Sequence, residues 1–329
     1  MAQLYPFLFK LDGMTQAYIW GGEKLKSLVR EYPVDEPLAE IWTVSDRPED
    51  ERVSVIANGP LAGTTLRQLM EEHADELLGD VPPVDGKFPL LVKLMNSAQR
   101  LSLQVHPPVE KAAELGGDPK TESWFFLEGT EPTAQLFAGL PRGVTREQFE
   151  TTLRTDGDLE PLLYAIQPKP GDCLFLPSGR LHAMDAGSVF LEVQENSNTT
   201  YRVFDWNRVD KKTGQPRELH VEKALASIDF ADVEPELQEP LPDTEGENTF
   251  DHLVDCPQFT LERWSITIEQ NHEPTRSFEL ITALTPLTIS SSAGDLPIPR
   301  LCTALVPASV PRFSVRGKDA SYIRTYVSF

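Results

Sequence analysis

Short apolar runs, many with alternating polar positions and most bounded by Pro, Gly or other turn residues, recur along most of the chain. Runs of this length that are rich in β-branched and aromatic residues are typical of strands in a sandwich or barrel. The pattern therefore predicts a mainly β fold. The clearest predicted strands are AEIWTVSD at 39–46, FPLLVKLMN at 88–96, RLSLQVHP at 100–107, ESWFFLEG at 122–129, DCLFLPSG at 172–179 and SVFLEVQE at 188–195.

Three segments have the 3.6-residue apolar period of a helix instead. Residues 65–78 place leucine and methionine side chains near one face, and Gly79 follows as a stop. Residues 145–155 begin at Thr145, which has a glutamine three residues on, as in a capping box. A third helix is predicted over 217–228.

The segment 229–248 is acidic and proline-bearing, which is typical of a linker or an extended crossover. Beyond it the strand pattern returns for roughly eighty residues, a size that can fold alone. We therefore predict a larger domain over 1–228, which holds the three helical segments, and a smaller β domain over 249–329.

The chain has 51 acidic and 30 basic residues, which give a formal net charge of −21. This field repels phosphate backbones and anionic lipid head groups, so we expect neither nucleic-acid nor membrane partners. A phosphorylated ligand would need a locally basic pocket. The N-terminal segment lacks the features of a secretory signal, and no apolar run reaches the roughly 18 residues of a membrane span, so we expect a cytoplasmic protein.

The strongest chemical signal is the segment GDCLFLPSGRLH, which predicts a strand, a tight Pro-x-Gly turn and a histidine that opens the next strand. Its spacing at Gly171, Pro177, Gly179 and His182 matches the second cupin motif residue for residue. A lone strand histidine is more often structural. In this frame, however, the turn aims the imidazole into the barrel, where neutral histidine is a common metal ligand.

Two further segments supply candidate ligands. Gln104 and His106 are spaced i, i+2 on a predicted strand, which puts both side chains on one face. Glu122 begins another strand, where taken singly it would be a solvated charge. Two histidines, a carboxylate and an amide oxygen together predict a divalent metal site that suits Zn²⁺, although Fe²⁺ or Mn²⁺ would also fit.

Longer segments around these residues resemble the type I phosphomannose isomerases. The resemblance runs from about Phe7 to Arg208, is strongest over 88–208, and is closest to the shorter bacterial enzymes. It implies a cupin-type jelly-roll barrel with a few helices and a second, smaller, degenerate cupin-like β domain. The segments that carry it are LVKLMNSAQRLSLQVHP, KTESWFFLEG, PGDCLFLPSGRLHAM and FLEVQENSNTTYRVFDWNR, with IWGGEKL, EIWTVSD and ANGPLAG nearer the start.

The resemblance also implies an activity and a set of site residues. The activity is a metal-dependent interconversion of mannose 6-phosphate and fructose 6-phosphate through a cis-enediol, with one Zn²⁺ per chain or another divalent metal. From the residues alone, each lysine or arginine could equally be a surface charge. The implied metal ligands are Gln104, His106, Glu122 and His182, the sugar site is lined by Lys120, Glu192 and Arg202, the phosphate is held by Lys93 and Ser102, and Arg208 lies at the pocket edge.

Two departures from the general cupin pattern bear on the function. The other cupin motif, with paired histidines and a nearby glutamate, is replaced by Gln104, His106 and the distant Glu122, which favours the isomerase branch over cupin dioxygenases. The C-terminal unit carries only His252 and His272, in no cupin spacing, so we expect a metal-free repeat with a structural role.

Several alternatives stay open at this point. For the reaction, Arg202 is assigned to stabilise charge, while Glu192 and Lys120 are both candidates for the proton carrier. A different cupin metalloenzyme, such as an Fe²⁺ dioxygenase, and a non-enzymatic sugar-binding cupin are the rival functions. The presence of all four predicted metal ligands favours an enzyme. The chain is expected to be a monomer or a homodimer.

Overall fold

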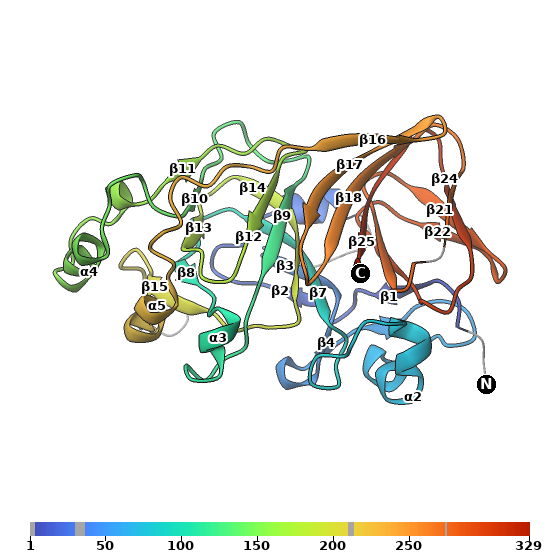
Figure 1. The fold of residues 1–329 in the computed structure, drawn as a ribbon, viewed down its shortest axis with the longest axis horizontal. Coiled ribbons are helices and arrows are strands. Elements are labelled where there is room, and N and C mark those ends of the chain that lie inside the picture. The colour runs from blue at the N-terminus through green and yellow to red at the C-terminus, as the bar shows by residue number, and fades with distance from the viewer. Residues whose placement is uncertain (1–3, 30–36, 210–213, 274) are drawn as a thin grey trace.

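The computed structural model describes residues 4–29, 37–209, 214–273 and 275–329. In this part of the chain, two β units lie side by side, with the short helices at the periphery (Figure 1). None of the helices in the described residues has the length and apolar character needed to span a bilayer.

The first unit consists of a six-stranded and a five-stranded antiparallel sheet. Apolar side chains from both sheets, such as Trp124 and Phe190 on one and Leu136 and Met184 on the other, share one core cluster, so the sheets face each other. The six-stranded sheet has the order β12 (Cys173–Leu176), β9 (Glu122–Phe126), β14 (Ser188–Glu195), β7 (Leu90–Ser97), β3 (Glu40–Val44) and β2 (Thr15–Gln16), and the five-stranded sheet has the order β11 (Ala165–Ile166), β10 (Leu136–Ala138), β13 (His182–Met184), β8 (Leu103–Val105) and β15 (Tyr201–Phe204).

The strands β7 and β14 are buried on both faces, which explains their nearly continuous apolar sequences. On β14, Val189, Leu191 and Val193 point away from the first unit into a core that also contains residues of the second unit. The alternate residues, which include Phe190 and Glu192, therefore point into the space between the two sheets of the first unit. This alternation places polar side chains inside the barrel.

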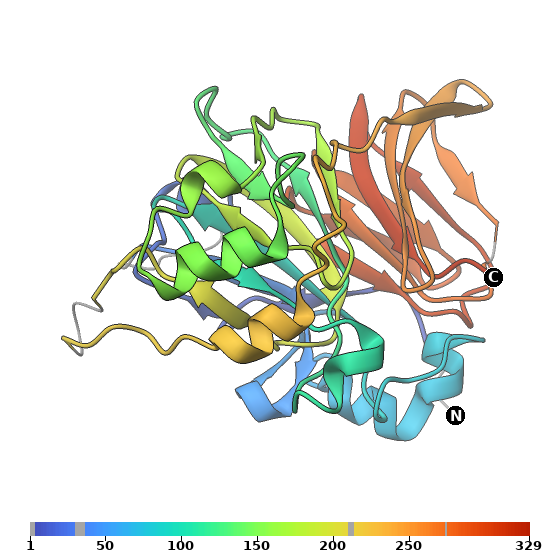
Figure 2. The same cartoon turned by 60° about the vertical axis from the view of Figure 1, so that its left-hand side comes forward.

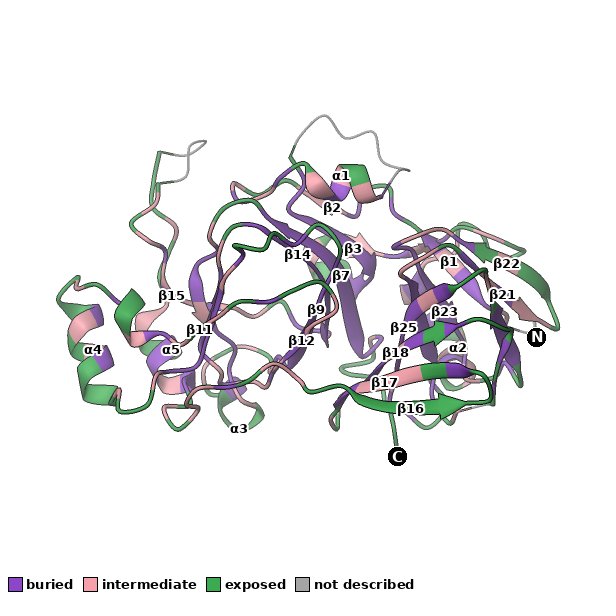
Figure 3. Ribbon diagram, turned by 90° about the horizontal axis from the view of Figure 1, so that it is seen from above, coloured by how far each residue is buried: buried purple, intermediate pink, exposed green. Residues whose placement is uncertain are grey.

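The second unit is built on an eight-stranded sheet and a four-stranded sheet. Figure 3 shows the central strands of both units in the buried colour and β16 as exposed. The larger sheet has the order β16 (Leu241–Glu245), β17 (Asn248–Asp255), β18 (Thr260–Ile266), β25 (Ala320–Tyr326), β20 (Glu279–Ala283), β23 (Thr303–Val306), β1 (Phe7–Lys10) and β6 (Val55–Ile56), the smaller has the order β19 (Gln270–His272), β24 (Phe313–Arg316), β21 (Leu287–Ser291) and β22 (Gly294–Ile298), and β4 (Asp46–Arg47) pairs separately with β5 (Arg52–Val53).

Two N-terminal strands complete the sheet of the C-terminal unit. On β1, Phe7 pairs with Leu305 of β23, and Phe9 pairs with Ile56 of β6. Figure 1 accordingly shows the blue β1 beside the red strands. The strand β16 also begins inside the predicted linker 229–248. The domain boundary stays a prediction, because the two units share a sheet and a core.

The predicted helices correspond to α2 (Leu66–Leu78), α4 (Arg146–Arg154) and α5 (Val221–Ser227). Thr65 caps α2 in a full capping box, and Thr145 accepts a hydrogen bond from the Gln148 N–H at the start of α4. The remaining short helices are α1 (Lys24–Leu28), α3 (Val109–Ala112) and the 3₁₀ turns η1 (Pro48–Asp50) and η2 (Glu160–Leu162).

The helix predicted over 217–228 starts too early. Residues 217–220 are not helical, because their backbone bonds to β15 instead: the His220 N–H donates to the Arg202 carbonyl over 2.8 Å. The shorter α5 and the neighbouring α4 pack on the outer face of the five-stranded sheet (Figure 2). That face is therefore closed, and the inner face is left for the functional residues.

The N-terminal strand gives a first testable prediction. Phe7 is fully buried in the core that joins the two units. We expect Phe7→Ala to lower the free energy of unfolding by about 3–5 kcal/mol, because the ring leaves a cavity that its neighbours cannot fill. Urea denaturation checks this, with Leu241→Ala, a truncation on the exposed strand β16, as the control. Equal midpoints for the two variants would contradict the prediction.

Candidate metal centre and active site

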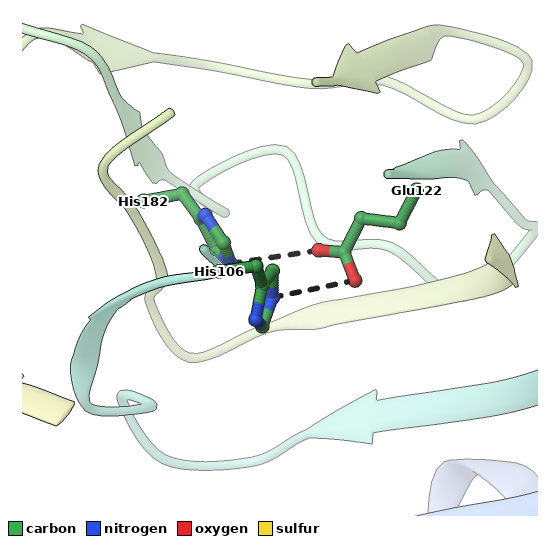
Figure 4. Close-up of side chains that lie close together, drawn as sticks. All are labelled: His106, Glu122 and His182. Carbon is green, nitrogen blue, oxygen red and sulfur yellow. Dashed lines mark ion pairs between the residues drawn. The ribbon is translucent and has the colours of Figure 1, made fainter. Parts of the chain in front are cut away.

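Three buried side chains meet inside the first unit at the ends of three strands. His106 follows β8 directly, Glu122 is the first residue of β9 and His182 is the first residue of β13. The Glu122 carboxylate faces both imidazoles, with Oε2 3.6 Å from His106 Nε2 and Oε1 3.5 Å from His182 Nε2 (Figure 4). One ligand atom from each residue lies within 4.8 Å of the others, which is close enough to hold one metal ion.

The backbone fixes which imidazole nitrogen faces Glu122. His106 Nδ1 is 2.8 Å from the Thr199 carbonyl oxygen, and His182 Nδ1 is 2.9 Å from the Arg180 carbonyl oxygen. Because a carbonyl oxygen can only accept, each Nδ1 carries the proton and each Nε2 has a free lone pair. A hydrogen bond of this kind commonly orients a metal-ligating histidine.

The protonation states also suit a metal. Burial lowers the pKa of His182 to about 3, and burial with the nearby Lys120 ammonium lowers the pKa of His106. Burial opposes ionisation of Glu122, but the nearby Lys120 ammonium favours the carboxylate, and the pKa of this carboxyl lies well below its usual range. At neutral pH the site therefore holds two neutral imidazoles and a carboxylate, which are the forms that bind metals.

The Glu122 carboxylate is short of partners. Lys120 Nζ lies 2.5 Å from Oε2, but neither carboxylate oxygen accepts a hydrogen bond of normal geometry from the described residues. A buried carboxylate without such bonds is costly. A bound cation between Glu122 and the two histidines would relieve that cost, so the donor set fits a divalent metal.

The fourth predicted ligand, Gln104, lies at the edge of this group. Its amide nitrogen is 3.2 Å from His182 Nε2, and the two residues are direct cross-strand partners. Rotation of the amide by 180° would bring its oxygen to the same place. On the other side, Gln104 is the cross-strand partner of Arg202, so one row of side chains runs from His182 to Arg202.

A cavity of about 490 Å³ opens beside the metal group, between the inner faces of the two sheets. Gln104 and Lys120 line it and also contact the metal group. Four cationic and two carboxylate side chains line it, which makes it locally basic in a chain of net charge −21. The lining residues are Tyr18, Trp20, Glu40, Lys93, Met95, Leu101, Ser102, Gln104, Lys120, Trp124, Glu192, Asn198, Thr200, Arg202 and Arg217.

On the six-stranded side, Lys93 is already paired with carboxylates. Its Nζ is 3.0 Å from Glu192 Oε2 and 3.9 Å from Glu40 Oε2. Trp124 Nε1 donates to Glu192 over 3.0 Å and Trp42 Nε1 donates to Glu40 over 2.6 Å. Burial opposes the charge on Lys93, but the two carboxylates outweigh it and raise the pKa of the ammonium. Lys93 is thus charge-balanced where it lines the cavity.

On the five-stranded side, arginines outnumber carboxylates. Arg202 Nη1 donates to the Glu218 carbonyl over 2.8 Å. Arg208 and Arg217 both bind the buried Asp205 carboxylate, and Arg208 also donates to the Arg100 carbonyl. Arg208 does not line the cavity, although the sequence predicted it at the pocket edge. Its guanidinium is turned toward Asp205 instead.

Of the predicted site residues, Lys93, Ser102, Gln104, Lys120, Glu192 and Arg202 line the cavity, and His106, Glu122 and His182 form the metal group beside it. The sequence does not identify Glu40 or Arg217 as site residues. Glu40 lies in a predicted strand, and Arg217 lies at the start of a predicted helix. For Glu40, the spacing of two residues to Trp42, which donates to its carboxylate, is a signal in the sequence.

Comparisons with known proteins agree with this geometry. A family model for the catalytic domain of phosphomannose isomerase type I matches residues 8–125. The putative mannose-6-phosphate isomerase YvyI of Bacillus subtilis is 33% identical over 303 residues, which cover 91% of this chain and 92% of that protein. The mannose-6-phosphate isomerase ManA of the same organism is 32% identical, with 85% of each chain covered.

The fold is similar over a still larger share of the chain. The crystal structure of the mannose 6-phosphate isomerase from Bacillus subtilis superposes with a TM-score of 0.88 at 30% identity, covering 98% of this chain and 100% of that one. This likeness confirms the mainly β, cupin-type fold predicted from the sequence.

Proposed function

Because this chain belongs to the type I phosphomannose isomerase family, we propose that it interconverts mannose 6-phosphate and fructose 6-phosphate with the help of a bound divalent metal. The observation that carries the proposal is the buried group of His106, Glu122 and His182 beside a basic cavity. The rival activities, a cupin dioxygenase or a sugar-binding cupin without activity, have no such support from the relatives.

The proposed metal is zinc, held by His106 Nε2, His182 Nε2, Glu122 and the amide oxygen of Gln104. Two nitrogen and two oxygen donors form a set that zinc accepts, although other divalent metals share this preference. When bound, the metal would act as a Lewis acid that favours negative charge on substrate oxygens. Family membership and the donor set support a metal, and the choice of zinc is our proposal.

Three charged residues of the cavity have proposed roles in the reaction itself. The reaction moves a proton between C1 and C2 of the sugar, so it needs an acid/base group within reach. Glu192 and Lys120 both line the cavity and are both proposed for this role. Arg202, the cross-strand neighbour of Gln104, would stabilise negative charge that develops on the substrate.

Lys93 and Ser102 remain proposed contacts of the substrate phosphate, and both line the cavity. The ion pairs of Lys93 with Glu192 and Glu40 mean that a phosphate there would share its ammonium with two carboxylates. Arg208 is proposed to act only indirectly: it binds Asp205, which also binds the cavity residue Arg217. A cytoplasmic location and a monomeric or homodimeric state stay predictions.

A coupled assay with and without a chelator tests the function and the metal together. We expect protein purified without added metal to contain about one divalent ion per chain, with zinc as the major element, because the donors of His106, Glu122 and His182 already lie together. Chelation should abolish isomerisation of mannose 6-phosphate, and added Zn²⁺, Mn²⁺ or Co²⁺ should restore it. Elemental analysis gives the metal content. Full activity in protein that contains no metal would exclude the proposed metal role.

A further inference from the structure

The two sides of the cavity differ in how their charges are balanced. On the six-stranded side, Lys93 lies between two carboxylates. On the five-stranded side, Arg202 forms no ion pair with a described carboxylate, its buried Nε has no hydrogen-bond partner among the described residues, and Arg217 shares its one carboxylate with Arg208. Positive charge is therefore in excess on the arginine side.

The excess positive charge destabilises the charged form of Arg202. Burial lowers the pKa of the Arg202 guanidinium, and the positive charge of Arg217 lowers it further. The two guanidinium groups line the same cavity and repel each other, and an anion bound between them would relieve the repulsion. The cavity, which both side chains line, is where such an anion can enter.

Arg217 is held in place by several bonds. Its Nε donates to Asp205 Oδ2 over 2.8 Å, and its Nη2 donates to Oδ1 of the same carboxylate. Asp205 directly follows β15 and is buried. Val209 forms a β-bridge with Pro216 just before Arg217, and the backbone of His220 bonds to Arg202 just after it. The guanidinium is thus positioned before any ligand binds.

The distance from the metal group suits a sugar phosphate. His182, Gln104 and Arg202 are successive partners on three neighbouring strands, so the backbones of His182 and Arg202 are roughly 10 Å apart at about 4.8 Å per strand. The segment that carries Arg217 lies one step beyond β15. A hexose phosphate bound with C1 and C2 at the metal group would have room in this cavity to bring its C6 substituent to Arg217.

We infer that Arg217 is a further contact of the substrate phosphate, in addition to the proposed contacts Lys93 and Ser102, and that Asp205 is the positioning residue that holds Arg217. The inference rests on the proposed function for the identity of the substrate. A planar guanidinium fits two phosphate oxygens, and a charge-assisted bond of this kind selects phosphorylated over free sugars. Arg217 would therefore determine specificity and not take part in proton transfer.

The test compares Arg217→Gln, Arg217→Lys and Asp205→Asn with the wild-type, metal-loaded enzyme. Loss of one charge-assisted bond corresponds to roughly a tenfold to hundredfold loss of affinity. We expect Arg217→Gln to raise KM for mannose 6-phosphate by about this factor with kcat within a few fold of wild type, which is the pattern of a contact made equally in ground and transition states. Arg217→Lys should recover part of the loss, and Asp205→Asn should show a smaller rise in KM.

Inorganic phosphate is the probe that does not depend on turnover. Calorimetric titration should show that Arg217→Gln weakens phosphate binding by a similar factor. Arg154→Gln is the matched control and should bind as wild type, because Arg154 is also ion-paired but lies on the exposed side of α4. If the Arg217→Gln and Arg217→Lys variants bind phosphate as tightly as wild type, the inference is wrong even when isomerase activity is present. If phosphate binding falls as expected but no sugar phosphate is isomerised, the anion site stands and the proposed function fails.

Discussion

The His182→Ala variant is expected to lose its metal and at least about 1000-fold in kcat/KM for mannose 6-phosphate. The substitution removes one of the two imidazoles that face Glu122. A Lewis acid contributes several kcal/mol to the stabilisation of developing charge, and each 1.36 kcal/mol is about tenfold in rate. Elemental analysis and the coupled assay on the same preparation measure both losses, while circular dichroism shows whether the fold is retained.

The control for this variant has to be a histidine outside the cavity. His220 is unsuitable, because its Nδ1 accepts a hydrogen bond from the Arg202 N–H. His73 is better, since it lies on α2, outside the cavity, and its ring pairs with Glu76 on the same helix. His73→Ala should retain metal and activity. Comparable turnover in His182→Ala and His73→Ala would remove His182 from the site.

Replacement of Arg324 by Met is expected to lower the free energy of unfolding by about 3–5 kcal/mol, because it leaves two buried carboxylates without their cation. Arg324 Nε donates to Glu279 over 2.6 Å and Nη1 lies 3.3 Å from Glu262. All three residues are buried inside the second unit. Burial opposes the charge on Arg324, but the two carboxylates outweigh it and raise the pKa of the guanidinium.

Arg316→Met provides the matched control in the same unit. Arg316 pairs with Asp295, but both side chains are about half exposed, and exposed pairs contribute at most about 1 kcal/mol. Denaturant unfolding of the two variants should therefore differ clearly. The kcat of folded Arg324→Met should equal that of wild type, because the cluster does not contact the cavity. Similar stabilities of the two variants would show that Glu262 and Glu279 are satisfied by other partners.

The sequence carries local signals for Gln104, His106 and His182, and the structure brings His106 and His182 together with Glu122. Gln104 and His106 share a strand face through a spacing of two, and the Pro-x-Gly turn before His182 sets the direction of the next strand. Such patterns can be read within about ten residues. That these segments meet at Glu122 came from the resemblance to a family and from no spacing in the chain.

The parts of the site that the sequence missed depend on pairing between distant segments. Glu40 enters the cavity because β3 pairs with β7, which places Met95 opposite it. Arg217 is held at the cavity by Asp205, in a segment whose backbone bonds to β15 at His220 and is not helical over 217–220. Neither the pairing of β3 with β7 nor the bond between Arg217 and Asp205 produces a periodic pattern in the sequence, because each joins two separate segments of the chain.

The second unit carries a partial copy of the first unit's charged cluster. Glu40 accepts from Trp42 Nε1 over 2.6 Å, and Glu262 accepts from Trp264 Nε1 over 2.7 Å, with the same spacing of two. The cation is Lys93 in the first cluster and Arg324 in the second. His272 bonds to the Tyr322 hydroxyl. These contacts support the interpretation of the second unit as a degenerate repeat with a structural role.

The pairing of β1 with β23 also means that β1 cannot complete its sheet until late in translation. Leu305 is synthesised roughly 300 residues after its partner Phe7, which at about 5–20 residues per second takes about 15–60 s. During that time β1 can pair with β6, but its other edge presents unpaired N–H and C=O groups, which favour association with foreign strands. One edge of the first strand therefore stays unpaired until nearly all of the protein has been synthesised.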